Sequence, residues 1–243
     1  MMSKLQKRPQ TIASSSLLTR RHFLSGALAV PIAPLRSWLR PTQTSPYVVV
    51  LGTAQDAGVP QVNCFNENCN AVRRGVRPLP RVSSIGLVDP LAGKRFIFDA
   101  TPDFASQVGE LLTHPAGTAL PRASVPLQEY LHGIFLTHGH MGHYTGLIHI
   151  GREGAAASRL PLYVSPSMAS YLNDNEPWAF LVQNHHVQLT VLQPEIRLVL
   201  TDSLAVVGWI VPGCMNWGGT LGNEVVGGID YNDATHPGYG SYC

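Results

Sequence analysis

Three histidines stand close together in the segment Thr137-His138-Gly139-His140-Met141-Gly142-His143. Neutral imidazole is a favoured ligand of zinc, with iron and manganese as alternatives, in sites that keep one position open to water. A bound divalent ion lowers the pKa of that water towards about 7, which supplies hydroxide as a nucleophile at neutral pH. The spacing therefore predicts a site for one or two metal ions, and metal-assisted attack on an electrophilic carbonyl or phosphorus.

The elements around the histidines have the lengths and patterns of an α/β protein. A short apolar run, Ile134-Phe135-Leu136, predicts a buried strand that leads into the histidines, and another predicted strand ends at Asp99. Further apolar runs predict strands at 47–51, 82–88, 95–98, 162–164, 187–192 and 204–211, with helices at 104–112 and 167–172. Strands that lead into helices around a layered core predict an α/β sandwich.

At these residues the chain resembles the metallo-β-lactamase-fold hydrolases, whose motif His-x-His-x-Asp-His follows a strand and whose preceding strand ends in aspartate. It is more similar to the branch that contains the pyrroloquinoline-quinone biosynthesis protein B. The likeness covers residues 46–212 and rests on residues 51–61, Asn63-Cys64, Ser83-Ser84-Ile85 and Thr101-Pro102-Asp103-Phe104. It implies a four-layer αββα metallo-β-lactamase-like sandwich that is incomplete at the C-terminus.

The resemblance also implies roles for single residues. His138 and His140 would bind a first metal ion and His143 a second. Asp99 would orient a ligand imidazole through its other ring nitrogen. Asp103 is an equal candidate for that task and for capping the helix that starts near Phe104. A metal-bound hydroxide would then attack a small-molecule substrate, namely an ester, a lactone or a phosphodiester.

Two departures from the family pattern affect the second half of the site. Gly142 stands where the family aspartate would bind the second ion. The segment 213–216 reads Gly-Cys-Met-Asn where relatives carry a ligand histidine, so the late donors are Cys214, Asp230 and His236. Two alternatives to a hydrolase therefore stay open: an iron-dependent hydroxylase-like protein of pyrroloquinoline-quinone biosynthesis, and a degenerate or truncated relative without catalysis.

Two further clusters, a pair of cysteines and a group of arginines, lead to separate predictions. Cys64 and Cys69 resemble the cysteine loop that holds a structural zinc in relatives. They predict part of such a zinc site or a disulfide, and both alternatives rank above a pair of free thiols. Four arginines predict either a solvated face or a surface that attracts an anionic substrate; these are Arg73, Arg74, Arg77 and Arg81.

Charge divides the chain into a leader and a body. Residues 1–40 hold seven Lys and Arg and no acid, whereas the rest holds ten basic and fifteen acidic side chains. Arg20-Arg21-His22-Phe23-Leu24 followed by a short apolar stretch predicts an export leader over 1–40, read by the twin-arginine export machinery and directing the chain to the periplasm.

The rest of the chain divides into a linker at 41–46, a domain at 47–212 and a glycine-rich, poorly defined tail at 213–243. The acidic body argues against a nucleic-acid partner. No apolar run in it reaches the roughly 18 residues of a membrane-spanning helix.

Overall fold

The computed structural model describes residues 43–114, 116 and 125–209, and all of them lie in one compact unit of the chain, Thr42–Cys243. The predicted leader and the predicted glycine-rich tail lie outside the described residues. Among the residues that are described, no helix is long and apolar enough to cross a membrane.

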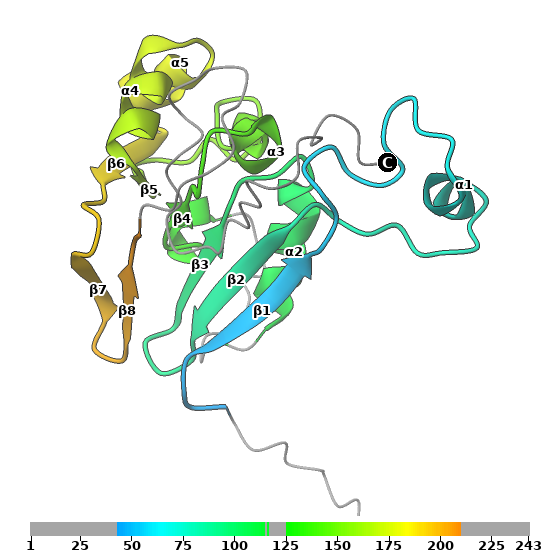
Figure 1. The fold of residues 1–243 in the computed structure, drawn as a ribbon. Helices are drawn as coiled ribbons and strands as arrows, with labels where there is room; N and C mark the ends of the chain where they lie inside the picture. The colour runs from blue at the N-terminus through cyan, green and yellow to red at the C-terminus, as the bar shows by residue number, and fades with distance from the viewer. Residues whose placement is uncertain (1–42, 115, 117–124, 210–243) are drawn as a thin grey trace, which may run out of the picture. The chain divides into compact units, whose positions relative to one another are not determined.

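A six-stranded mixed sheet forms the centre of this unit, with its strands in sequence order (Figure 1). The strands are β1 Tyr47–Gly52, β2 Ser84–Asp89, β3 Lys94–Phe98, β4 Ile134–Phe135, β5 Leu160–Val164 and β6 Val187–Val191. β1, β2 and β3 pair antiparallel, and β3 to β6 pair parallel. Two antiparallel steps make β1 run in the same direction as β3, so the carboxyl ends of β1, β3 and β4 lie along one edge of the sheet.

Helices cover one face of the sheet and form the main core with it. They are α2 Phe104–Thr113, α3 Met141–Tyr144, η2 Thr145–His149, α4 Pro166–Asp174 and α5 Trp178–Gln183. The apolar side of α2, at Phe104 and Leu111, packs in one cluster with strand residues such as Ile97 and Ile134. These side chains are at most 3% exposed, so the hydrophobic effect fixes the helices on this face. Another short helix, η1 Leu127–Glu129, precedes β4.

A two-stranded hairpin, β7 Arg197–Thr201 and β8 Leu204–Val207, contributes to the opposite face. Aromatic rings run across the strands there: Phe98 stacks on Phe135 at 4.6 Å, and Phe135 stacks on Tyr163 at 4.4 Å between ring centroids. Leu198 and Val206 of the hairpin pack against this row. The layers confirm the predicted α/β sandwich, and the described part of its second sheet consists of this hairpin.

Several short elements were not predicted from the sequence: α1 Glu67–Arg73, η1, α5 and β7. Each is seven residues or shorter, which is too short for a helical or strand periodicity of apolar residues to be recognised. The start of α1 is fixed instead by a side chain, because Asn66 Oδ1 accepts a hydrogen bond from Cys69 N at 3.0 Å. The last strand of the described residues, β8, ends at Val207, and residues 210 and 211 of the predicted strand 204–211 lie outside the described part.

Asp89 ties the hairpin to the sheet. This carboxylate is fully buried at the end of β2 and accepts hydrogen bonds from the backbone N–H groups of Leu91 and Ala92 and from the hydroxyls of Thr201 and Ser203. Burial by itself would raise the pKa of Asp89, but these four donors hold it below its ordinary value. The charged carboxylate therefore stabilises the contact between the β2–β3 turn and the β7–β8 turn.

We expect Asp89→Asn to lower the free energy of unfolding by about 1–3 kcal/mol, because the amide presents a donor to groups that are themselves donors. The stabilisation by Asp89 is present above the ordinary aspartate pKa of about 4 and is lost as the pH falls through the lower folded value. Urea titrations between pH 7 and pH 3 measure both effects. Asp202→Asn, an exposed residue of the same hairpin turn, is the matched control; equal stability of the two variants at pH 7 would contradict the role of Asp89.

Candidate metal centre

Four of the predicted site residues lie at the sheet edge where β1, β3 and β4 end, namely Asp99, His138, His140 and His143. Asp99 follows β3, and His138 and His140 follow β4 before α3 begins at Met141. Because β3 and β4 are parallel neighbours, their carboxyl ends bring Asp99 beside the histidine loop. The loop after β1 reaches the same edge and carries Asp56.

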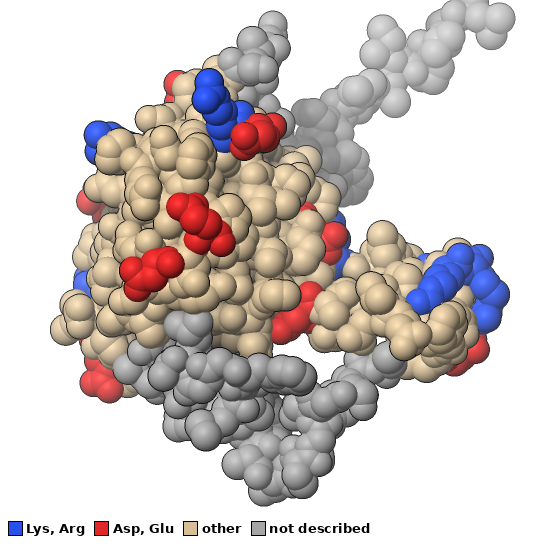
Figure 2. Space-filling view, turned by 90° about the horizontal axis from the view of Figure 1, so that it is seen from above, with Lys and Arg blue, Asp and Glu red and all other residues tan. Residues whose placement is uncertain are grey.

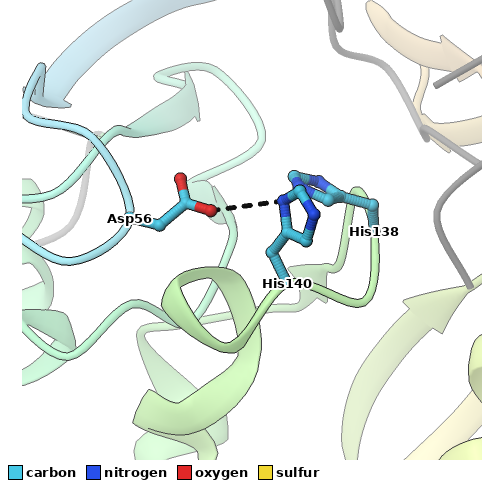
Figure 3. A group of neighbouring side chains, drawn as sticks. All are labelled: Asp56, His138 and His140. Carbon is cyan, nitrogen blue, oxygen red and sulfur yellow. Dashed lines mark hydrogen bonds and ion pairs between the residues drawn. The ribbon is translucent and has the colours of Figure 1, made fainter. Parts of the chain in front are cut away.

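Asp56, His138 and His140 form the group that could hold a metal ion (Figure 3). One donor atom from each residue lies within 4.8 Å of the others. Asp56 Oδ2 lies 3.2 Å from His140 Nδ1, and His138 Nε2 lies 2.8 Å from the same nitrogen. Two imidazoles and one carboxylate are the three protein ligands of many catalytic zinc sites. The side chains of His140 and Asp56 are 37% and 40% exposed, so the group is open to water and substrate.

Asp99 is the buried anchor of the histidine loop. Its Oδ1 accepts hydrogen bonds from Thr137 N at 2.8 Å and from Thr137 Oγ1 at 2.9 Å, and its Oδ2 lies 2.7 Å from His143 Nδ1. Asp99 has a φ of +68°, a left-handed conformation that is uncommon outside glycine and that is found at functional sites.

Thr137 connects Asp99 to the imidazole ring of His138. The Thr137 hydroxyl has one proton, which it donates to Asp99, so towards His138 Nδ1 at 2.9 Å it acts as the acceptor. His138 then carries its proton on Nδ1 and presents the lone pair of Nε2 towards His140 and Asp56. Orientation of a ligand imidazole through its other nitrogen is the role predicted for Asp99, and at His138 it runs through Thr137.

His143 lies between two carboxylates. Its Nδ1 faces Asp99, and its Nε2 lies 3.0 Å from Asp56 Oδ1. Burial alone would lower the pKa of His143, but the hydrogen bonds with Asp56 and Asp99 raise it to about 10. Burial likewise opposes the charge on Asp56, yet hydrogen bonds with His140 and His143 bring the pKa of Asp56 far below its ordinary value. The predicted second-ion ligand thus has a carboxylate at each ring nitrogen.

Asp56 was not singled out as a ligand from the sequence, and a local turn places it. Gln55 Oε1 accepts a hydrogen bond from Ala57 N, and Gln55 O accepts one from Gly58 N at 2.8 Å. The turn is fixed to the sheet because Thr53 N and Ala54 N both donate to Arg81 O. The sequence does show an acidic residue, Asp56, soon after the first predicted strand. That this strand ends at the site, however, follows only from the order of the strands in the sheet.

Asp103 occupies the first position before α2 but does not cap that helix with its side chain. Its Oδ2 instead accepts a hydrogen bond from Val82 N at 2.8 Å. Gln107 Nε2 donates to Val82 O in the same segment, and Arg81 forms an ion pair with Glu110. Both predicted roles are therefore replaced by a third, in which Asp103 holds the segment before β2 against α2.

Cys64 and Cys69 are buried next to each other as free thiols. The disulfide alternative is therefore wrong, whereas the alternative of a partial zinc site stays a prediction. The hydrogen bond between the two thiols raises the pKa of Cys69. Arg73 donates to the backbone oxygens of Cys64 and Gln61 and holds the cysteine loop on α1.

The predicted arginine cluster beside this loop makes contacts with neighbouring residues of the chain. Blue side chains gather on the lobe that carries α1 in Figure 2. Arg74 pairs with Glu67 at 2.8 Å, and Arg77 donates to Asn68 Oδ1 at 2.8 Å. These contacts favour a structural role for the arginines over attraction of a substrate. The late donors predicted from the sequence, Cys214, Asp230 and His236, lie outside the described residues.

Comparison with known proteins supports the fold and the relationship. Residues 94–211 match the beta-lactamase superfamily domain. The chain is 31% identical over 130 residues to the coenzyme PQQ synthesis protein B of Methylorubrum extorquens, across 53% of this chain and 40% of that protein. It is 34% identical over 120 residues to the protein of the same name from Cupriavidus taiwanensis, across 49% of this chain and 36% of that protein.

Among solved structures, the zinc-bound PqqB from Methylobacterium extorquens has the same fold. Its TM-score is 0.57 at 24% sequence identity, and the alignment covers 73% of this chain and 58% of that one. The predicted metallo-β-lactamase-like fold and the likeness to pyrroloquinoline-quinone biosynthesis protein B are confirmed. The matched part spans about two fifths of the length of those curated relatives.

We expect Thr137→Val to weaken metal binding by about 10- to 100-fold, because valine keeps the shape of threonine but cannot connect Asp99 to His138. Competition against a chromophoric chelator measures the Zn²⁺ affinity. Thr113→Val removes an exposed hydroxyl on α2 and serves as the matched control. Unchanged Zn²⁺ affinity of Thr137→Val would contradict the orienting role of Thr137.

Proposed function

We propose that this chain, a PqqB-like protein with the metallo-β-lactamase fold, is a metal-dependent hydrolase whose metal site is formed by Asp56, His138 and His140. The observation that carries the proposal is the convergence of one carboxylate and two imidazoles within 4.8 Å at the carboxyl edge of the sheet. The donor set suits zinc and also iron. A PqqB structure is described as Zn²⁺-bound, so zinc is the first ion to test.

Some residues of the site would bind the metal ion, and others hold those ligands in position. A divalent ion at this place would lower the pKa of a bound water and polarise a substrate oxygen. His138 keeps its Nε2 lone pair directed into the group because Thr137 holds its Nδ1 proton. Asp56 stays ionised and offsets part of the charge of the ion, while His143 donates a proton from Nε2 to Asp56 Oδ1 and fixes that carboxylate.

The substrate class follows from the chemistry of the site. An activated water and a polarised oxygen suit substrates whose reaction centre gains negative charge in the transition state. We therefore propose a small ester, lactone or phosphodiester as the substrate. The exposure of His140 and Asp56 gives such a molecule access to the donor atoms.

A second candidate is an oxidative step in pyrroloquinoline-quinone biosynthesis with iron as the metal. The observation that favours it is the name shared by the curated relatives, coenzyme PQQ synthesis protein B. Metal identity separates the two candidates, since zinc has no redox chemistry and ferrous iron reacts with oxygen.

We further propose that the chain is exported to the periplasm by the twin-arginine machinery. The support is the paired Arg20-Arg21 followed by Phe23-Leu24 in an acid-free leader. This route carries folded proteins, so metal uptake at the histidine loop would precede export. Fractionation of cells that express the chain, compared with an Arg20→Lys/Arg21→Lys variant, tests this proposal.

The proposed hydrolase is tested by metal content and turnover of the full chain. We expect about one zinc per chain by mass spectrometry after purification without chelators. Esters, lactones and phosphodiesters that release a chromophore are then assayed before and after metal removal, and activity should return with Zn²⁺. His138→Ala should lose both the metal and the activity, because it removes a ligand, whereas the exposed His185→Asn should keep both.

The other outcomes decide between the remaining readings. Iron in the purified protein, together with oxygen consumption in place of hydrolysis, would support the oxidative candidate and overturn the hydrolase. A chain that retains no metal and gains no thermal stability from added Zn²⁺ would be a relative without metal catalysis.

A further inference from the structure

Gly142 has no space for a side chain because Asp56 occupies it. A Cβ placed on Gly142 would lie 2.5 Å from Asp56 Cβ and 2.6 Å from both Asp56 Cα and Asp56 O. Two of these neighbours are backbone atoms, so a rotation of the Asp56 side chain cannot relieve the overlap. Gly142 lies within α3 in a helical conformation, so space and not backbone geometry demands glycine here.

The same contact places the Asp56 carboxylate on the histidines on both sides of Gly142. Asp56 Oδ2 lies 3.2 Å from His140 Nδ1, and Asp56 Oδ1 lies 3.0 Å from His143 Nε2. Gly142 stands where the family pattern has a metal-binding aspartate. In the structure the carboxylate next to the histidines comes instead from a loop that is 86 positions earlier in the chain.

His143 determines how Asp56 can act. It lies between Asp56 and Asp99, and Asp99 is itself held by Thr137 N and Thr137 Oγ1. This chain of hydrogen bonds, buried at Asp99 and Thr137, fixes one oxygen of Asp56 and leaves the other facing His140. Both ring nitrogens of His143 face carboxylates, an arrangement that suits a residue that positions Asp56.

We propose that Asp56 binds a single divalent metal ion together with His138 and His140, that His143 positions Asp56 and does not bind a second ion, and that Gly142 is required to admit the Asp56 carboxylate. The proposal depends on the proposed function only in needing a metal ion at this site. It adds the source of the carboxylate, the number of ions and the reason for the glycine.

The test uses Zn²⁺ binding to the full-length, metal-free chain, measured by competition against a chromophoric chelator. We expect about one tightly bound Zn²⁺ per wild-type chain. Asp56→Asn should weaken binding at least about tenfold, because the amide keeps the shape of the carboxylate but lacks its charge. Gly142→Ala should weaken binding by a similar factor although every donor is still present, because its methyl group displaces Asp56.

Gly109→Ala is the matched control for Gly142→Ala. Gly109 lies in α2, and an added Cβ there meets no atom within 4 Å, so this variant should bind Zn²⁺ as the wild type does. If Gly142→Ala does not fold, as judged by circular dichroism of the metal-free protein, Asp56→Asn still tests the proposal.

Co²⁺ in place of Zn²⁺ separates a ligand from a positioning residue. Loss of a ligand changes the visible absorption of bound Co²⁺, so Asp56→Asn should alter the spectrum. Asp99→Asn, which removes a positioning group, should lower the affinity and leave the spectrum of bound Co²⁺ unchanged.

Three results would overturn the proposal: a second tightly bound Zn²⁺ that remains in a Cys64→Ser/Cys69→Ser variant, wild-type Zn²⁺ affinity in Asp56→Asn, or wild-type Zn²⁺ affinity in a folded Gly142→Ala. Failure of the proposed hydrolase is a different result. In that case Zn²⁺ binds as described and depends on Asp56, while no ester, lactone or phosphodiester is turned over.

Discussion

The site depends on one buried carboxylate, that of Asp99. A buried charge is costly unless hydrogen-bond donors surround it, and the donors near Asp99 are the backbone and hydroxyl of Thr137 and the ring of His143. Each donor belongs to the segment that carries the histidines. The need to satisfy Asp99 therefore fixes the loop after β4, the orientation of His138 and, through His143, the position of Asp56.

The sheet turns this local requirement into a site. β3 and β4 are parallel neighbours, and β1 runs in the same direction two strands away from β3. Three loops therefore leave the sheet at one edge, and each brings a polar group that its strand could not carry inside the core. The helices on one face and the β7–β8 hairpin on the other pack against the sheet and stabilise it.

The fold was largely predictable, since the apolar runs located all six strands of the main sheet and two longer helices. The short elements α1, α5 and β7 were missed because their positions depend on a capping side chain or on packing against distant strands. The contact of Asp103 was likewise not predictable, because it joins residues that are far apart in the chain. Its type and place before α2 suggested a cap or a site residue, whereas its contact is Val82 N, a partner 21 positions away in the chain.

The histidine cluster, the strand before it and the aspartate at the end of the preceding strand could be predicted from the chain, because these features are local and parallel strands align their ends. Which carboxylate accompanies the histidines depends on tertiary packing. Asp56 lies 82 residues before His138 in the chain, and its approach depends on strand order, on the turn at Gln55–Gly58 and on the space left at Gly142. The spacing of residues along the chain does not reveal the space beside Gly142, because that space forms only when the loop of Asp56 packs against the segment of Gly142.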